Sequence, residues 1–389
     1  MFTLCISTMH SENVTYLALG SNLGNRHFNL QRVIFEINET LGDVIDVSSI
    51  YSNKAVGFDG GDFLNACIAI KTTLTPNALL NRLLQLETRL GRNRNQGEGY
   101  ASRTIDIDIL YYGQNVVDGP DLSIPHPKIP LRNFVLKPLA DIAPQFYHPI
   151  LKKDTRNLLQ ESRDEHPLTK EPLKLFKNRS ALYAQVQFLA IEGNIGAGKT
   201  TLAKMIAEDF NGKLVLERFA DNPFLPKFYN DQQRYAFPLE MSFLADRYQQ
   251  FVDDTTQFNL FKNFMVSDYD IFKSLIFAQV TLAKEEFNLY RKLFNIMYKE
   301  VKKPDLYIYL NQPTDRLLTN IKRRGRAYEQ NISASYLNAI HNGYRSFITS
   351  HPEQETLIIN LESLDFVTNR DDYLQVLSRM EERLLQLIF

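Results

Sequence analysis

The stretch GNIGAGKTT at residues 193–201 has the residue types and spacing of a phosphate-binding loop. A glycine, four further residues and then Gly-Lys-Thr form the pattern of loops that hold nucleoside triphosphates. Glycines allow consecutive backbone N–H groups to face phosphate oxygens, and Lys199 can reach the terminal phosphates. The Thr200 hydroxyl oxygen can coordinate Mg²⁺. The residues expected to contact the triphosphate are Gly193, Asn194, Ile195, Gly196, Ala197, Gly198, Lys199, Thr200 and Thr201.

The segments on either side of this loop support that interpretation. Residues 186–191 (VQFLAI) form an apolar run typical of a buried parallel strand, and residues 201–210 have the apolar spacing of a helix. Without this context, a glycine-rich turn that ends in Lys-Thr would be an adequate explanation of the motif. The sequence therefore predicts an α/β P-loop domain with a parallel sheet, and we place it at residues 186–389.

A second chemical signal lies far upstream, in RTIDIDIL at residues 103–110. Side chains alternate between the faces of a strand, so Asp106 and Asp108 share one face and the isoleucines share the other. Two neighbouring carboxylates repel each other unless cations lie between them, and a pair of Mg²⁺ ions bound to a nucleoside triphosphate would fill that role. The alternative is a solvated, charged strand face. Nearby arginines, whose planar forks bind phosphate, favour the metal site.

The elements around Asp106 and Asp108 follow the order β-α-β-β-α-β, which is that of a ferredoxin-like α+β sandwich. This order by itself predicts no function. The strands are expected at 15–20, 44–51, 63–72 and 103–112, and the helices at 27–41 and 77–90.

Residues 14–160 resemble the 6-hydroxymethyl-7,8-dihydropterin pyrophosphokinases of folate biosynthesis. The resemblance rests on GSNLG, FLN, GRNR, SRTIDIDIL and PHPKIPLRNF in this order. It implies transfer of the β,γ-diphosphate of ATP to the pterin, with release of AMP. It also implies that Asp106 and Asp108 hold Mg²⁺. The implied ATP residues are Arg92, Arg94, Arg103, His126 and Arg132, and the implied pterin residues are Asn65 and Phe134. A structural turn for His126 and core packing for Phe134 are the alternatives.

The second half offers three further groups beside the P-loop. Glu217 follows the predicted strand 213–216 and could accept a proton from an attacking hydroxyl, or it could instead pair with Arg218 or another base. Asp268 ends the apolar run FMVSD, so it could hold Mg²⁺ with Thr200. The basic run IKRRGR contains Arg324 and Arg326, which could neutralise a transferred phosphoryl group, although such runs are usually solvated.

Residues 186–389 resemble the deoxynucleoside kinases, particularly bacterial deoxyadenosine/deoxyguanosine kinases. By that resemblance Glu217 is the base for the 5′-hydroxyl, Lys199 is catalytic, and Arg324 and Arg326 belong to a lid. Glu240 is implied to contact the nucleobase, and Arg247 to lie near Glu217 and the sugar. The resemblance further implies a homodimer through this domain. Two features depart from the family: an acid-Arg-Ser triplet is missing near residues 267–269, and Asn320 stands where a lid arginine is expected.

The family often has Gln where this chain has Glu240. An ionised Glu offers only acceptors, which suits the amino group of adenine or the donors of guanine but not a thymine carbonyl. We therefore expect a purine deoxynucleoside, deoxyadenosine first, with deoxyguanosine or deoxycytidine as alternatives. Two other interpretations stay open for this half: a non-catalytic binding or dimerisation module, and a regulatory GTPase.

Whole-chain properties limit the remaining possibilities. The length of 389 residues suggests two or three domains, and residues 161–185, a charged stretch with two prolines, are interpreted as an interdomain linker. Residues 1–13 are interpreted as an extension. The net charge of -1 favours no nucleic-acid partner, and the two cysteines fit a reducing compartment. The sequence contains no apolar run of membrane-spanning length. We expect a cytoplasmic, bifunctional kinase that uses Mg²⁺ and ATP.

Overall fold

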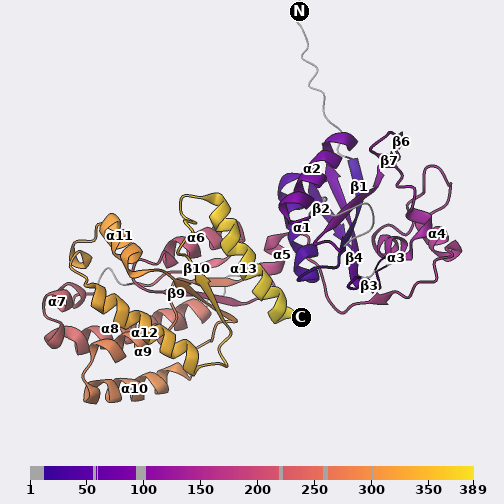
Figure 1. The fold of residues 1–389 in the computed structure, drawn as a ribbon. Helices are drawn as coiled ribbons and strands as arrows, with labels where there is room; N and C mark the ends of the chain where they lie inside the picture. Colours follow the sequence, from indigo (N-terminus) through magenta and orange to yellow (C-terminus); the bar gives the residue numbers. More distant parts are fainter. Residues whose placement is uncertain are drawn as a thin grey trace, which may run out of the picture. The chain divides into compact units, whose positions relative to one another are not determined.

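The structure, a computed structural model, describes residues 13–55, 58, 60–92, 102–218, 222–256, 262–299 and 301–389. The chain divides into two compact units (Figure 1), Met1–Ala181 with Phe389, and Leu182–Ile388. This division falls inside the stretch predicted as a linker. Residues 1–12, nearly all of the predicted extension, are outside the described ranges.

The N-terminal unit is built on an antiparallel sheet in the order β5-β1-β4-β3-β8, with β2 also paired to β4. The predicted single strand 44–51 is wrong, because the chain forms two short strands there, β2 and β3, which pair with different parts of β4. The strands are β1 Asn13–Ser21, β2 Asp43–Val47, β3 Tyr51–Asn53, β4 Phe63–Thr72, β5 Asp106–Tyr112, β6 Val117–Asp118, β7 Ser123–Ile124 and β8 Thr169–Lys170.

Helices cover both faces of this sheet. α1 and α2 pack on one face over a core of aliphatic side chains, which includes Leu17, Leu19 and Ile107. α3 and α4 pack on the other face, against Leu110 and Tyr111. The alternation of β5 therefore leaves Asp106 and Asp108 on the face opposite the α1/α2 core. The helices are α1 Arg26–Thr40, α2 Pro76–Arg89, η1 Ile129–Leu131, α3 Asn133–Ile142, α4 Thr155–Glu161 and α5 Arg179–Tyr183.

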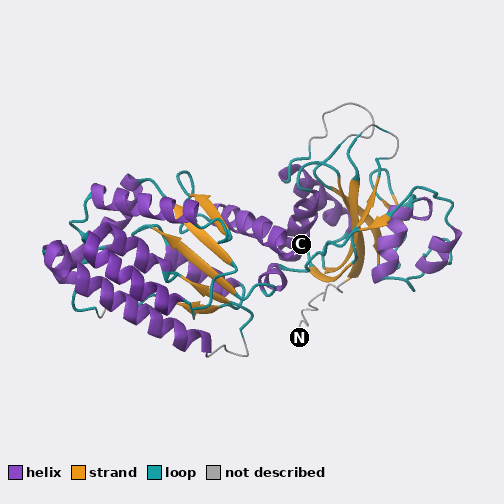
Figure 2. Cartoon of the chain, turned by 90° about the horizontal axis from the view of Figure 1, so that it is seen from below, coloured by secondary structure: helices purple, strands orange, loops and turns teal. Residues whose placement is uncertain are grey.

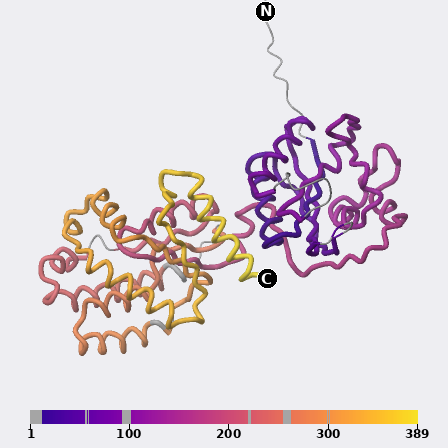
Figure 3. Tube along the Cα trace, in the orientation of Figure 1, coloured from indigo at the N-terminus to yellow at the C-terminus, as the bar shows by residue number. Residues whose placement is uncertain are grey.

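The prediction that residues 161–185 form a linker is wrong for most of that segment. After α4 the chain runs back along the N-terminal unit (Figure 3) and adds β8 to the edge of its sheet. The Gln31 side chain binds the backbone of Phe176 in both directions, at 2.7 and 2.8 Å, while Leu173 and Leu175 pack on the core. A charged composition concealed this packing, because two alternating leucines are too few to produce a recognisable period.

The C-terminal unit is a parallel sheet in the order β10-β11-β9-β12-β13, which confirms the predicted parallel sheet. Helices lie on both of its faces (Figure 2): α6 and α13 on one, and the bundle of α8, α9 and α12 on the other. The strands are β9 Phe188–Gly193, β10 Lys213–Val215, β11 Met265–Ser267, β12 Leu306–Asn311 and β13 Thr356–Asn360. The helices are α6 Lys199–Asp209, α7 Leu225–Asn230, α8 Gln232–Thr256, α9 Phe272–Thr281, α10 Lys284–Tyr298, α11 Thr314–Arg324, η2 Ala327–Glu329, α12 Ala334–Ser350 and α13 Arg370–Ile388. None of the helices in the described ranges is long and apolar enough to cross a membrane.

The first residues of the C-terminal unit pack into its core, so they determine where the chain can be cut to give a stable fragment. Leu182 and Tyr183 are fully buried, and the Tyr183 ring stacks on Phe210 with 4.3 Å between centroids. We expect a fragment of residues 182–389 to fold alone, and a fragment of residues 186–389 to melt roughly 6–24 °C lower. Each lost side chain contributes about 1.5–3 kcal/mol by burial, and each kcal/mol changes the Tm of such a domain by about 2–4 °C. Thermal melts of both fragments check this expectation, and equal melting temperatures would contradict it.

Candidate active sites

A cavity of about 860 Å³ in the N-terminal unit gathers most of the residues predicted to act there. Its wall consists of the ends of β1, β4 and β5, residues 128–135, and residues 161–166. Arg92 and His126 are not part of that wall but interact with Asp106 and Asp108. Arg94 lies outside the described residues. The predicted site residues that line the cavity are Asn65, Arg103, Asp106, Asp108, Arg132 and Phe134.

Two arginines hold Asp106. Arg92 Nη1 donates to Asp106 Oδ1 at 2.6 Å, and Arg103 Nη1 lies 3.3 Å from Oδ2. Arg92 also pairs with Glu87, a buried side chain of α2 that accepts a hydrogen bond from Ile107 N at 2.8 Å. Burial would lower the pKa of Arg92, but Asp106 and Glu87 outweigh that effect and raise it. Glu87 thus positions Arg92 beside the carboxylates, a role that sequence reasoning missed because Glu87 is one acid among many on a predicted helix.

The negative charge of Asp108 is disfavoured by its surroundings. Burial and the charge of Asp106 raise the pKa of Asp108, although His126 and Arg132 oppose this rise. A divalent cation would relieve the repulsion, and paired carboxylates are the hard oxygen donors that Mg²⁺ takes. Within the described ranges, no group of three or more His, Cys, Asp or Glu side chains is arranged for a metal. Phosphate oxygens and water would therefore complete the coordination, so the residues present fit Mg²⁺ that arrives with a nucleotide.

Asn65 and Phe134 lie on the wall of the same cavity. The amide of Asn65 donates to Asn53 Oδ1 at 2.7 Å and to Tyr51 O at 3.3 Å, which sets its orientation at the wall. The ring of Phe134 packs against the α3 core, and the Arg132 guanidinium lies 5.4 Å from its centroid. Phe134 therefore combines core packing with a position at the cavity, so the two predicted roles are not exclusive.

Residues 161–166, from the segment predicted as linker, form an additional part of this wall. Asp164 Oδ2 accepts a hydrogen bond from Asn133 N at 2.7 Å, and Asn133 Nδ2 donates to Asp164 O at 2.6 Å. Asn133 is the first residue of α3 and lies between Arg132 and Phe134 in the chain. The bonds to Asp164 therefore connect residues 161–166 to two residues that are predicted to contact ligands. The sequence provided no signal for this role.

The P-loop of the C-terminal unit joins β9 to α6, so the strand and helix expected on either side of it are present. Gly198 has φ +94° at the start of α6, and a Cβ there would lie 2.8 Å from the Phe366 ring, so only glycine fits. Lys199 Nζ donates to the carbonyls of Gly193 and Asn194 at 2.9 and 3.0 Å. Burial and the charge of Lys273 lower the pKa of Lys199 to about 8. The charge of a triphosphate would oppose that lowering.

A cavity of about 570 Å³ extends from this loop. The P-loop residues that line it are Gly196, Ala197, Gly198, Lys199, Thr200 and Thr201, whereas Ile195 faces a second, smaller cavity. Arg316, on its wall, donates to the carbonyls of Leu361, Glu362 and Leu364 at 2.6–3.0 Å and so holds the loop after β13 in place. Asn320 Nδ2 donates to Gly196 O at 3.0 Å. The contacts of Arg316 were not predicted. They are made to backbone carbonyls of the loop after β13, which every sequence has and which no residue type marks.

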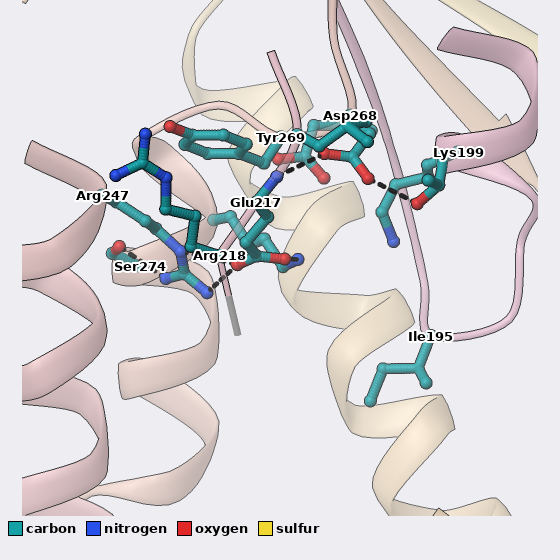
Figure 4. Close-up of polar contacts among 12 residues, drawn as sticks. Ile195, Lys199, Glu217, Arg218, Arg247, Asp268, Tyr269 and Ser274 are labelled. Carbon is teal, nitrogen blue, oxygen red and sulfur yellow. Dashed lines mark hydrogen bonds and ion pairs between the residues drawn. The ribbon is translucent and has the colours of Figure 1, made fainter. Parts of the chain in front are cut away.

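The Glu217 carboxylate, whose side chain is 10% exposed, lies between two cations, one of which, Arg247, is drawn in Figure 4. Arg247 Nε and Nη2 lie 2.8 and 2.6 Å from Glu217 Oε1, and Lys273 Nζ lies 2.5 Å from Oε2. Burial would raise the pKa of Glu217, but Lys273 and Arg247 outweigh it and hold the pKa far below its usual value. The alternative that Glu217 pairs with a base is confirmed in part: the bases are Arg247 of α8 and Lys273 of α9, not Arg218. Lys273 was missed, although a lysine inside the apolar stretch IFKSLIFA was a visible signal.

The carboxylate of Asp268 connects Glu217 to the P-loop. Asp268 Oδ1 accepts from Glu217 N at 2.8 Å, and Oδ2 accepts from the Thr200 hydroxyl. These adjacent oxygen donors fit Mg²⁺, with phosphate and water as further ligands.

The second cavity of the C-terminal unit, about 110 Å³, contains Glu217, Glu240 and Arg247 on its wall. Arg324 and Arg326 line both this cavity and the larger P-loop cavity. Glu329, which is buried, pairs with both arginines, and its Oε1 lies 3.2 Å from Arg326 Nη1. The two arginines are therefore held between the two cavities by an acid that the sequence analysis did not identify.

Comparison with known proteins agrees with the resemblances. Residues 16–144 match the family model of 7,8-dihydro-6-hydroxymethylpterin-pyrophosphokinase, and residues 189–386 match that of deoxynucleoside kinase. The chain is 37% identical over 199 residues to a Bacillus subtilis deoxyguanosine kinase, covering 50% of this chain and 96% of that protein. It is 31% identical over 217 residues to a Lactobacillus acidophilus deoxyadenosine kinase, covering 52% and 98%.

The N-terminal match is equally clear. The chain is 41% identical over 136 residues to the Bacillus subtilis 2-amino-4-hydroxy-6-hydroxymethyldihydropteridine pyrophosphokinase, covering 34% of this chain and 80% of that protein. The chain therefore belongs to two families, the hydroxymethyl-dihydropterin pyrophosphokinases through its N-terminal unit and the deoxynucleoside kinases through its C-terminal unit.

Proposed function

We propose that the chain is a bifunctional kinase with one complete active site in each unit. The N-terminal unit transfers the diphosphate of ATP to 6-hydroxymethyl-7,8-dihydropterin, and the C-terminal unit phosphorylates the 5′-hydroxyl of a purine deoxynucleoside. The observation that carries this proposal is the pairing, in each unit, of phosphate-binding groups with carboxylates at the wall of a cavity. We also interpret the N-terminal sheet as the ferredoxin-like sandwich expected from the sequence.

In the N-terminal unit, Asp106 and Asp108 would hold Mg²⁺, which neutralises charge on the triphosphate when bound. Arg92 and Arg103 orient the phosphates, with His126 and Arg132 beside them. Asn65 and Phe134 hold the pterin by a hydrogen bond and by stacking. The hydroxymethyl oxygen then attacks the β-phosphorus and its proton passes to water. The bond between the β-phosphorus and the α,β-bridging oxygen breaks, and AMP departs with that electron pair.

In the C-terminal unit, Glu217 orients the 5′-hydroxyl and takes its proton as the bond to the γ-phosphorus of ATP forms. Lys273 and Arg247 keep Glu217 ionised and aimed, so its role is one of positioning as much as of basicity. Thr200 and Asp268 would hold Mg²⁺, which would neutralise charge on the phosphates of ATP. Lys199, Arg324 and Arg326 stabilise charge on the transferred group, and ADP departs.

The acceptor is a purine deoxynucleoside because Glu240 lines the cavity that contains Glu217 and presents carboxyl oxygens to it. Matched relatives named as deoxyguanosine and deoxyadenosine kinases agree with this class. A homodimer through the C-terminal unit and a cytoplasmic location stay predictions.

An assay of the full chain with ATP tests both activities. We expect AMP with hydroxymethyl-dihydropterin, and ADP plus a nucleoside monophosphate with purine deoxynucleosides. ADP formation that needs no acceptor would favour a GTPase-like hydrolase for the C-terminal unit. ATP binding without turnover of any deoxynucleoside would favour a non-catalytic module.

Asp164 offers a test of the N-terminal cavity wall. Asp164→Ala removes the acceptor at the start of α3 and frees the turn that carries Arg132 and Phe134. Because a hydrogen bond to a charged group contributes about 1.5–3 kcal/mol, kcat/KM for the pterin should fall roughly 10- to 100-fold. Asp164→Asn, which keeps an acceptor, and Asp118→Asn, which changes an exposed charge outside the cavity wall, should lose much less. Equal losses in all three variants would refute this positioning role, and thermal melts of the variants control for folding.

A further inference from the structure

The carboxyl group of Glu240 is buried and only half satisfied. It projects from α8 into the 110 Å³ cavity that also contains Glu217. The Thr281 hydroxyl donates to Glu240 Oε1 at 3.0 Å, whereas Oε2 has no hydrogen-bond partner among the described residues. A buried oxygen without a partner is costly, and a ligand that pairs with it recovers this cost.

Ionisable groups face Glu240 from every element packed around it. They are Tyr229 of α7, Arg247 of α8, Lys273 of α9, Tyr290 of α10, Tyr336 of α12, and Glu217 after β10. The other charged residues that line the same cavity are Lys199, Asp268, Arg324, Arg326 and Glu329. Burial raises the pKa of all three tyrosines, so they stay neutral near pH 7. Glu217 and Arg247 form a permanent ion pair, since the pKa of Glu217 is far below neutrality and that of Arg247 is raised.

Both charge states of Glu240 are accessible near neutral pH. Burial raises the pKa of Glu240 to about 7, with Arg247 and the Thr281 hydrogen bond opposing that rise. The Thr281 hydroxyl lies 3.0 Å from Oε1 and 2.9 Å from Phe277 O, and its single proton can serve only one of them. When Thr281 donates to Oε1, the proton of the neutral form resides on Oε2, and this is the neutral form that faces a bound base. The neutral group therefore presents a donor and an acceptor, and the ionised group presents two acceptors.

The two purine bases match these states differently. Adenine presents an N6–H donor beside the N1 acceptor, so it pairs with both oxygens only when Oε2 carries a proton. Against the ionised carboxylate, the N1 lone pair of adenine faces a negative oxygen. Guanine presents two donors, N1–H and N2–H, and pairs with the ionised carboxylate through both. Guanine also pairs with the neutral form, through N1–H and O6, so it loses nothing when Glu240 ionises.

We propose that Glu240 sets the preference of the nucleoside kinase site between adenine and guanine by its protonation, favouring adenine when neutral and guanine when ionised. The inference rests on the proposed purine deoxynucleoside kinase activity and goes beyond it, since it makes base preference depend on pH through one residue.

The ratio of kcat/KM for deoxyadenosine to kcat/KM for deoxyguanosine, measured on the full chain from about pH 6 to about pH 9, tests this inference. Effects of Lys199 and of ATP are common to both substrates and cancel in the ratio. We expect the ratio to fall about tenfold or more, because an unmatched polar contact costs about 1–3 kcal/mol. Glu240→Gln, which has a donor and an acceptor at every pH, should give a flat ratio. Asp246→Asn, which removes an exposed carboxylate from the same helix, should retain the dependence of the wild type.

A substrate analogue keeps the test decisive if Glu240→Gln does not fold. The 1-deaza analogue of deoxyadenosine lacks the N1 acceptor, so it cannot profit from a protonated Glu240. Its kcat/KM relative to deoxyguanosine should change with pH much less than that of deoxyadenosine. A flat wild-type ratio for deoxyadenosine, or an equal pH dependence in Glu240→Gln or with the analogue, would overturn the inference. Absence of phosphorylation of either purine at every pH would instead refute the underlying kinase activity.

Discussion

Asp106→Ala and Asp108→Ala should each reduce AMP formation from ATP and hydroxymethyl-dihydropterin by more than about 10³-fold. Loss of one carboxylate from a two-metal site leaves the metal and the triphosphate misplaced, and metal-based charge stabilisation contributes several kcal/mol. The two substitutions differ in one useful respect. Asp106→Ala also releases Arg92 and Arg103, whereas Asp108 forms no ion pair within the described residues. A similar loss in both variants therefore points to metal binding rather than to arginine placement.

Steady-state assays of AMP release across a range of Mg²⁺ concentrations provide the measurement, and nucleoside phosphorylation by the same protein is the internal control. Thermal stability separates folding from function. Asp108→Ala should not lower the Tm, because it removes a partly buried carboxylate whose charge is disfavoured by loss of water and by Asp106. Wild-type AMP production in either variant would refute the assignment of these carboxylates as metal ligands.

Glu217→Gln should lower deoxynucleoside turnover by about 10²- to 10⁴-fold, the usual contribution of a general base. Glutamine keeps the shape and an acceptor but cannot take a proton from the 5′-hydroxyl. It also leaves the charges of Arg247 and Lys273 without their shared partner. Breaking such a buried pair destabilises a protein by about 3–5 kcal/mol, so the Tm should fall by roughly 6–20 °C.

Turnover at saturating deoxynucleoside, measured well below the lowered Tm, checks the catalytic role. ATP binding should change little, because Glu217 lies on the acceptor side of the P-loop. Lys273→Met is the informative companion, since it removes a positioning contact and leaves the base in place. It should lower kcat less than Glu217→Gln does. Near-normal kcat in Glu217→Gln would reduce Glu217 to a structural ion-pair partner, and loss of ATP binding would relocate it to the phosphate side.

Local sequence patterns were sufficient where chemistry depends on neighbours in the chain. The P-loop needs glycines, a lysine and a hydroxyl at short spacing, and one strand-turn-helix unit presents them all. The two aspartates of β5 needed only the alternation of a strand. The parallel sheet was predicted from short apolar runs, one of which ends at Asp268.

Predictions failed where a short segment depends on distant contacts. The strand predicted at 44–51 breaks because β2 and β3 pair with separate parts of β4. The stretch 161–185 resembles a linker by composition, yet it forms a sheet edge and part of a cavity wall. In both cases the hydrogen bonds that determine the structure are made to residues of other elements. The periodicity of the segment itself does not reveal them.

The sequence alone determined the two families, the order of the catalytic motifs, the P-loop and the acidic pair of β5, because each depends on residue type at fixed local spacing. The tertiary structure alone decided which charges are paired. It brought Glu87 to Arg92, Glu329 to the lid arginines, and Lys273 to Glu217. It also decided that Glu240 is buried with one oxygen unsatisfied. These properties arise from burial and from the approach of separate helices. Both determine the electrostatic free energy of a side chain, and neither can be deduced from its neighbours in the sequence.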